Sequence, residues 1–217
     1  MGIETMGNQN SAPTTLGAGQ STLGGGLGSL NLTKGEKLNL TKTAPGLTEV
    51  MVGLGWDVNA GTGADFDLDA QVVLLGENGK ARSQADLIFF NNLRSSCGSV
   101  IHQGDNRTGE GDGDDEKINV KLAQIPADVQ KVAFLVTIHE AVSRGQNFGQ
   151  VSNAFIRLVD NVTGAEIAKF DLTEDYSTSI SVIMGELYRH NGEWRFNASG
   201  QGRTEDLEGL CRLYGVL

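Results

Sequence analysis

The stretch ISVIMGELYRHNGEWRFNA, residues 180–198, consists of two alternating segments separated by an Asn-Gly pair. In both segments apolar and polar residues alternate, which is the periodicity of a strand with one buried face. Asn191 and Gly192, which join the segments, tolerate the positive φ angles that a tight hairpin turn requires. The stretch therefore predicts a β-hairpin.

Short runs with the same periodicity recur along the chain. They cover residues 50–54, 68–75, 87–90, 118–122, 132–138, 154–159 and 167–172. The segment Leu-Asn-Leu-Thr-Lys occurs twice, beginning at Leu30 and at Leu38, and each copy also alternates. The 217 residues include 30 glycines and only 3 prolines, which is typical of many turns between short elements. Together these patterns predict an all-β fold.

The first 29 residues depart from the strand pattern. They contain one charged residue, Glu4, and 15 glycine, serine or threonine residues. Such a segment buries too little apolar surface to offset the entropy lost on ordering. We therefore expect residues 1–29 to be a disordered leader and residues 30–217 to form one domain.

The last 14 residues, TEDLEGLCRLYGVL, change to a helical period. The apolar residues spaced at i, i+3, i+4 and i+7 are Leu207, Leu210, Cys211 and Tyr214. Thr204 is the expected N-cap, and Gly215 is the expected end of the helix. The sequence thus predicts a short C-terminal helix.

Composition narrows the classes of partner. The formal net charge is -10 and the pI is about 4.7. These values argue against nucleic acid, because affinity for nucleic acid depends on cationic contacts with phosphates. The sequence contains no apolar run of bilayer length, and its start lacks the basic and apolar segments of a secretion signal. The expected location is cytoplasmic.

Two short stretches, residues 53–70 and 104–116, hold 10 of the 27 acidic residues. Their sequences are GLGWDVNAGTGADFDLDA and GDNRTGEGDGDDE. Carboxylates placed this close repel one another, and a bound cation relieves the repulsion. The many glycines widen the choice of backbone conformation, as a loop around an ion requires. We therefore interpret both stretches as cation-binding loops.

The first acidic stretch predicts a calcium site. On a strand, Asp65, Asp67 and Asp69 project from the same face, and Asp57 can fold over them from the preceding loop. Several oxygen ligands without histidine or cysteine select calcium or magnesium over zinc. Calcium is favoured because it accepts more oxygens in a looser geometry.

The second acidic stretch has the length of an EF-hand loop but not its pattern. Twelve residues run from Asp105 to Glu116. An EF-hand requires oxygen ligands at the third and fifth positions and glycine at the sixth, where this chain has Arg107, Gly109 and Glu110. We therefore predict a separate calcium loop of another kind, and two calcium sites in all.

These motifs, together with LNLTKGEKLNLTK at residues 30–42 and QNFGQVSNAFIRL at residues 146–158, resemble the TerD family of tellurite-resistance and stress proteins. The resemblance covers residues 30–217. It implies a β-sandwich of two sheets that binds calcium at two neighbouring acidic sites, in bacterial cytoplasmic proteins without a known reaction. The metal ligands that it implies are Asp57, Asp67 and Asp69 from the first motif, and Asp105, Asn106, Glu110, Asp114, Asp115 and Glu116 from the second. Asp65 and Asp112 occupy positions that we expect to vary.

Motifs of catalysis are absent from the sequence. His139 and Glu140 begin like a zinc protease motif, but Ser143 stands where the second histidine belongs. The chain has neither a Gly-x-Ser-x-Gly elbow nor a phosphate-binding loop that ends in Gly-Lys-Ser/Thr. The expected function is that of a calcium-binding, non-enzymatic stress-response protein that acts as a calcium-stabilised interaction scaffold.

Two alternatives remain open at the level of sequence. The first is a calcium-dependent module that docks on the inner membrane surface or on other proteins of a stress complex. The second is a metal-dependent phosphoesterase or nucleotide-binding protein, because a bound cation could bridge phosphate to an acidic loop.

Overall fold

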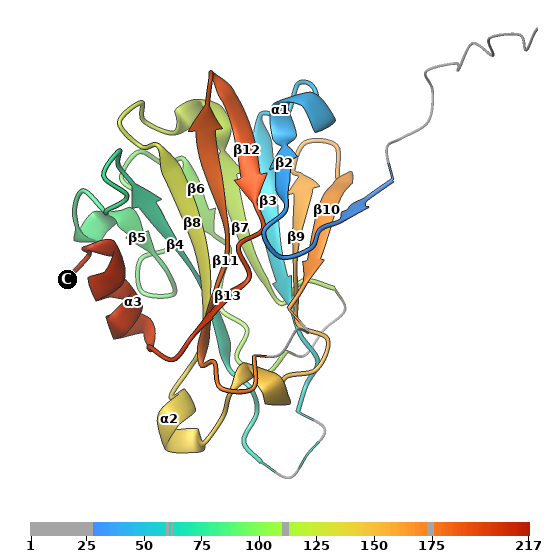
Figure 1. Ribbon diagram of the computed structural model, residues 1–217, viewed down its shortest axis with the longest axis vertical. Coiled ribbons are helices and arrows are strands. Elements are labelled where there is room, and N and C mark those ends of the chain that lie inside the picture. The colour runs from blue at the N-terminus through green and yellow to red at the C-terminus, as the bar shows by residue number, and fades with distance from the viewer. Residues whose placement is uncertain (1–27, 60, 62, 110–112, 173–175) are drawn as a thin grey trace, which may run out of the picture.

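The computed structural model describes residues 28–217, apart from residues 60, 62, 110–112 and 173–175. Within these residues two sheets face each other in a β-sandwich (Figure 1). The first sheet has the order β1-β10-β9-β3-β7-β6, and the second has the order β2-β12-β11-β8-β4-β5, with β13 paired to β11. The all-β sandwich with a C-terminal helix is therefore confirmed. The predicted disordered leader lies almost wholly outside the described residues and stays a prediction.

The first sheet is antiparallel except for β1, which pairs parallel with β10. Its strands are β1 (Leu30–Asn31), β3 (Glu49–Gly55), β6 (Val100–His102), β7 (Glu116–Lys121), β9 (Phe155–Asp160) and β10 (Glu166–Asp171).

The second sheet is antiparallel throughout. Its strands are β2 (Lys37–Asn39), β4 (Leu68–Leu75), β5 (Leu87–Ile88), β8 (Lys131–Ile138), β11 (Ser181–His190), β12 (Glu193–Asn197) and β13 (Gln201–Arg203).

Several short helices lie between the strands, and one follows the last strand. The α-helices are α1 (Leu40–Thr43), α2 (Ala141–Arg144) and α3 (Leu207–Tyr214), and the 3-10 helices are Gln84–Asp86, Leu122–Gln124 and Phe148–Gln150. In the part of the chain that the structure describes, no helix has both the length and the apolar character needed to cross a membrane.

Strand β4 of the second sheet is buried on both of its faces. On β4, Leu68, Val72 and Leu74 belong to the main core between the sheets. Val73 and Leu75 point to the opposite face, where they join a second apolar cluster with residues of α3 and the chain end. This explains why β4 is buried along its whole length, and it places α3 on the outer face of this sheet (Figure 1).

The predicted hairpin is confirmed. Strands β11 and β12 pair antiparallel, and His190 faces Glu193 across the turn. Asn191 and Gly192 have φ angles of 51° and 76°. These are the positive values that a two-residue hairpin turn requires.

The predicted C-terminal helix is also confirmed, but its cap is not the expected one. Asp206 is the N-cap, and its carboxylate accepts a hydrogen bond of 3.0 Å from the backbone N–H of Gly209. The prediction of Thr204 was wrong because an aspartate stands directly before the first helical turn, where its oxygen reaches an unpaired N–H. Gly215 ends the helix with a φ of 72°.

Two other local predictions differ from the structure. The second Leu-Asn-Leu-Thr-Lys copy is a strand only up to Asn39, whose side chain accepts a hydrogen bond from the N–H of Lys42 and so caps α1. An asparagine that can cap a helix here outweighs the alternating pattern. The sequence also missed β6 and β13, because three residues are too few to show a period.

Replacement of Gly185 by alanine should destabilise the fold. A Cβ atom at this position would lie 2.4 Å from the ring of Phe196 and 2.7 Å from the backbone oxygen of Asn197. Phe196 is fully buried, so neither neighbour can move freely. We expect a loss of about 1–3 kcal/mol in the free energy of unfolding, measured by urea denaturation.

The matched control is Gly76→Ala, where the nearest atom to a new Cβ lies at 3.5 Å and φ is not positive. This variant should change the free energy of unfolding by less than about 1 kcal/mol. Equal losses in the two variants would contradict the steric account.

Candidate metal centre

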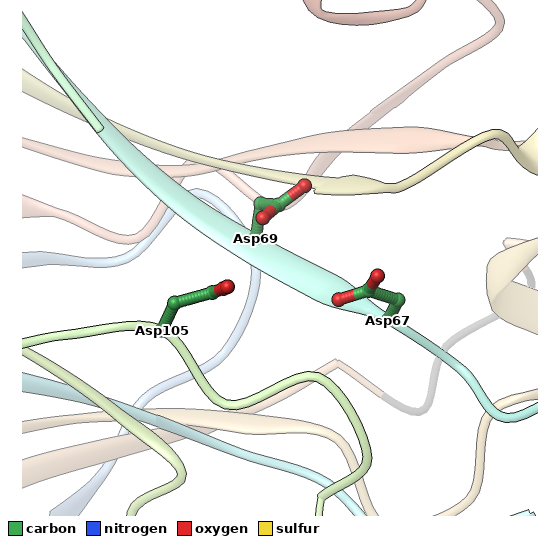
Figure 2. A group of neighbouring side chains, drawn as sticks. All are labelled: Asp67, Asp69 and Asp105. Carbon is green, nitrogen blue, oxygen red and sulfur yellow. The ribbon is translucent and has the colours of Figure 1, made fainter. Parts of the chain in front are cut away.

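Three carboxylates from the two acidic stretches meet at one end of the sandwich. Asp67 directly precedes β4, Asp69 lies on β4, and Asp105 follows β6 in the other sheet. Their nearest carboxylate oxygens all lie within 4.8 Å of one another. Figure 2 shows Asp105 on its own loop, extending toward the segment that carries Asp67 and Asp69. The cluster therefore joins one residue of the second acidic stretch to two residues of the first.

The cluster concentrates carboxylate groups that repel one another. Asp67 and Asp69 are 5% and 6% exposed, whereas Asp105 is open to solvent. Burial and, after it, repulsion by the carboxylates of Glu116, Asp67 and Asp105 together raise the pKa of Asp69 to about 7. A nearby cation would reverse that repulsion.

The protein supplies little positive charge of its own to this cluster. The Nε atom of Arg107 lies 3.6 Å from an oxygen of Asp67, but the arginine side chain is largely exposed. The Nδ1 atom of His139 lies 3.9 Å from an oxygen of Asp69. Within the described residues, neither Asp69 nor Asp105 forms an ion pair with a lysine or an arginine. Oxygen ligands that are close together and poorly compensated suit a hard divalent cation.

Glu116 and His102 hold the backbone beside Asp69. At Ala70, β4 pairs with β8 on one side only, since β5 pairs with β4 at Val72 and Val73 alone. On the open side, the Glu116 carboxylate accepts the N–H of Ala70 at 2.5 Å. Nε2 of His102 lies 3.1 Å from the Ala70 carbonyl oxygen and donates to it. Two side chains of the first sheet thus replace the missing strand neighbour of the second.

The hydrogen bonds of His102 define its tautomer. Its Nδ1 accepts the N–H of Gly104 at 3.2 Å, which leaves a proton on Nε2 for the Ala70 carbonyl. Burial disfavours a second proton on the ring, but the Glu116 carboxylate, 3.6 Å from Nε2, the Ala70 carbonyl and Asp105 together outweigh burial and raise the pKa of His102. Burial also raises the pKa of Glu116. The buried pair of His102 and Glu116 thus links the first sheet to the backbone of Ala70, the residue next to Asp69.

Asn106 and Asp115, two predicted ligands, organise the second acidic loop. The side-chain oxygen of Asn106 accepts the N–H groups of Thr108 and Gly109, both at 3.2 Å. Its amide nitrogen donates to Asp115 at 2.9 Å. The other oxygen of Asp115 accepts the backbone N–H of Trp56, also at 2.9 Å. These bonds fasten the second acidic loop to the first.

Trp56 packs into the same junction. Its indole N–H donates to the carbonyl oxygen of Phe66 at 3.2 Å. A Cβ atom on Gly109 would come within 2.5 Å of the indole nitrogen, and Gly109 has a φ of 72°. Only glycine therefore allows the second loop to approach the indole this closely.

Asp57 and Asp114 also contact protein partners. Asp114 has a buried side chain that forms a two-pronged ion pair with Arg157, at 2.6 and 2.9 Å. Asp57 is exposed and accepts a hydrogen bond of 2.6 Å from Asn153. Burial raises the pKa of Asp115, and the nearby carboxylates of Asp114 and Asp57 raise it further. A second group of carboxylates thus surrounds Asp115.

The structure brings together only part of the predicted ligand set. Asp67, Asp69 and Asp105 form the three-carboxylate cluster, with Glu116 behind it. Asp65 is exposed and does not belong to the cluster. Glu110 and Asp112 lie outside the described residues. The sequence pattern did not reveal Arg157 as the partner of Asp114 or Gln146 as a donor to the backbone oxygens of Ala64 and Asp65, because these contacts join distant segments.

Removal of the Glu116 side chain should destabilise the protein. In Glu116→Leu, the buried N–H of Ala70 loses its acceptor, and we expect a cost of about 1–3 kcal/mol in the free energy of unfolding. Glu116→Gln keeps a neutral acceptor and should lose clearly less. Urea denaturation without added metal measures both, and an equal loss in the two variants would refute this role of Glu116.

Comparisons with known proteins place the chain in a family. The model of the TerD domain matches residues 29–214. The tellurium resistance protein TerD of Serratia marcescens is 56% identical over 188 residues, which cover 87% of this chain and 98% of that protein. General stress protein 16U of Bacillus subtilis (strain 168) is 52% identical over 188 residues, which cover 86% and 97%.

A solved structure supports the fold. The crystal structure of a homologue of the telluride resistance protein from Streptomyces coelicolor A3(2) has a TM-score of 0.65 at 22% identity, and the match covers 76% of this chain and 95% of that one. The domain model spans nearly all of the described residues. The two relatives align with this chain over almost their whole length, and more than half of the aligned residues are identical. The chain therefore belongs to the TerD family.

Proposed function

We propose that this chain is a calcium-binding, non-enzymatic stress-response protein that acts as a calcium-stabilised interaction scaffold. The observation that carries the calcium part is the cluster of Asp67, Asp69 and Asp105, whose oxygens lie within 4.8 Å of one another. Two of the three carboxylates are almost fully buried. A calcium ion would offset their repulsion and hold the two acidic loops together.

The stress-response part rests on the relatives. Their names include tellurium resistance protein TerD, general stress protein 16U and stress response protein SCP2. These names support a role for this chain in resistance to tellurium compounds and in general stress. They are names of resistance and stress proteins rather than of enzymes, which supports a role without catalysis.

A second calcium ion belongs to the proposal. Asp57, Asp114 and Asp115 form the second group of carboxylates, and the pKa of Asp115 responds to the other two. The arginine that pairs with Asp114 supplies one positive charge there. Glu110 stays a predicted ligand that lies outside the described residues.

The proposal keeps the cytoplasmic location and the partners expected from the sequence. An ordered surface over the two loops would be available to other proteins of a stress complex or to the inner membrane surface. Calcium would act on this surface indirectly, because it orders the loops that form it.

Calcium should raise the thermal stability of the protein. At a concentration about 100 times the Kd, it should add about 2.7 kcal/mol to the free energy of unfolding. For a chain of this size that corresponds to a rise of about 5–10 °C in Tm, measured by differential scanning calorimetry against a chelator-treated sample. An unchanged Tm in millimolar calcium would refute the calcium site.

The variants Asp69→Asn and Asp65→Asn form a matched pair for this measurement. Asp69 is a buried member of the cluster, and Asp65 is an exposed aspartate of the same stretch. Asp69→Asn should lose most of the calcium-induced rise in Tm, and Asp65→Asn should retain it. Equal losses would show that general negative charge, rather than the cluster, binds calcium.

The effect of calcium should depend on pH. Without calcium, the folded state keeps a proton on Asp69 up to about pH 7, whereas the unfolded state loses it near pH 3.8. Because the folded state binds more protons in this window, the contribution of Asp69 to stability falls as pH rises. Calcium requires the carboxylate form, so the calcium-induced rise in Tm should grow from about pH 5.5 to about pH 8.

The same pH series on Asp69→Asn is the control. It should lack the part of the pH dependence that comes from Asp69, both with and without calcium. A calcium-induced rise in Tm that stays constant over this pH range in the unchanged protein would contradict the assignment of Asp69 as a ligand.

A further inference from the structure

A groove runs between α2 and α3 on the outer face of the second sheet, next to the carboxylate cluster. Its cavity has a volume of about 520 Å³, which is within the usual range of small-molecule sites. Asp69 forms part of its wall, and the first residues of α3 form another part. The groove and the carboxylate cluster therefore share one side chain.

Most of the groove surface is apolar. Ile138 and Ala141 are buried in its wall, and Phe90, Ile180 and Leu207 are half-buried. Val142 of α2, at the rim, is 80% exposed. An apolar body in the groove would remove these side chains from water, which is favourable.

The charged side chains of the groove are acidic, except for His139. Glu140 and Glu208 are already paired with Arg144 and Arg212. No lysine or arginine is among the described residues that line this cavity. The groove therefore favours a ligand with positive charge.

Asp69 is the group in the groove that most lacks a partner. Its side chain is only 9% exposed, and its carboxylate accepts no hydrogen bond within the described part of the chain. The nearest cationic group is Nδ1 of His139, at 3.9 Å. A largely buried carboxylate is poorly hydrated, and a ligand that brings a donor would satisfy it.

We propose that this groove binds an organic amine, with its ammonium group on Asp69 and its aromatic or aliphatic body against Val142, Ile180 and Leu207. A primary ammonium supplies three donors and one positive charge, which match a carboxylate that lacks both. Because the proposed calcium ion uses the same carboxylate, calcium and the amine compete. Only this competition rests on the proposed function, since the groove itself needs no metal.

The test is a titration of the full chain with 2-phenylethylamine in the presence of chelator, followed by heteronuclear NMR. Amide signals near Val142 and Leu207 should shift in a saturable manner. The matched anion 3-phenylpropionate has a similar body and should cause no such shift. Saturable binding of both compounds with equal affinity would overturn the proposal.

Three variants identify the contacts. Asp69→Asn should weaken amine binding by about tenfold or more, as expected for a charged hydrogen bond. Val142→Ser should weaken it by about fourfold, the effect of roughly one buried methylene. Val162→Ser is the matched control, because Val162 is 69% exposed but lies in the turn between β9 and β10. Equal effects of the two valine substitutions, or full binding by Asp69→Asn, would overturn the proposal.

The same titration in the presence of calcium separates the proposed calcium site from the proposed amine site. If calcium raises Tm, it should also weaken amine binding. Calcium that raises Tm without any effect on amine binding would contradict the placement of the ammonium on Asp69. If calcium leaves Tm unchanged, the proposed function fails, and the variants alone decide whether the amine site exists.

Discussion

The backbone of Ala70 needs two hydrogen-bond partners that no neighbouring strand supplies, and Glu116 and His102 supply them from the opposite sheet. This contact ties the two sheets together at one end of the sandwich. It also fixes the strand that carries Asp69, so that Asp105 from the other sheet lies within reach. A buried carboxylate is thus used for structure directly behind carboxylates that remain available to a cation. The arrangement concentrates negative charge at this end, and burial increases the repulsion.

The extent to which the fold follows from local sequence differs between elements. Strands of six or more residues, such as β4 and β8, have enough length to show their burial pattern, and Asn191-Gly192 specifies its turn through backbone conformation alone. The three-residue strands β6 and β13 exist because longer neighbours pair with them, which no local pattern records. At α1 a capping asparagine outweighs strand alternation. Local chemistry is thus sufficient for the long elements, and tertiary pairing decides the short ones.

The candidate site shows the same limit. The density of carboxylates identified Asp67, Asp69 and Asp105 as ligand candidates, but each acidic stretch was interpreted as a site of its own. The structure instead combines residues of both stretches in one cluster. Asp114 also pairs with Arg157, and Asn106 accepts hydrogen bonds within its own loop, contacts that the density of carboxylates did not predict. Sequence spacing predicts which side chains share a strand face, but which strand ends meet depends on the sheet order.

The position of Trp56 has a consequence for optical measurements. Its indole lies between the two acidic loops, where it donates a hydrogen bond to the Phe66 carbonyl oxygen and packs against Gly109. Its backbone N–H donates to the carboxylate of Asp115. The other tryptophan, Trp194, lies in the β11–β12 hairpin, where the guanidinium of Arg189 covers its ring at 4.4 Å. One fluorophore therefore senses the order of the loops, and the other serves as an internal reference in the same molecule. Trp56 fluorescence should therefore report on the conformation of the two acidic loops.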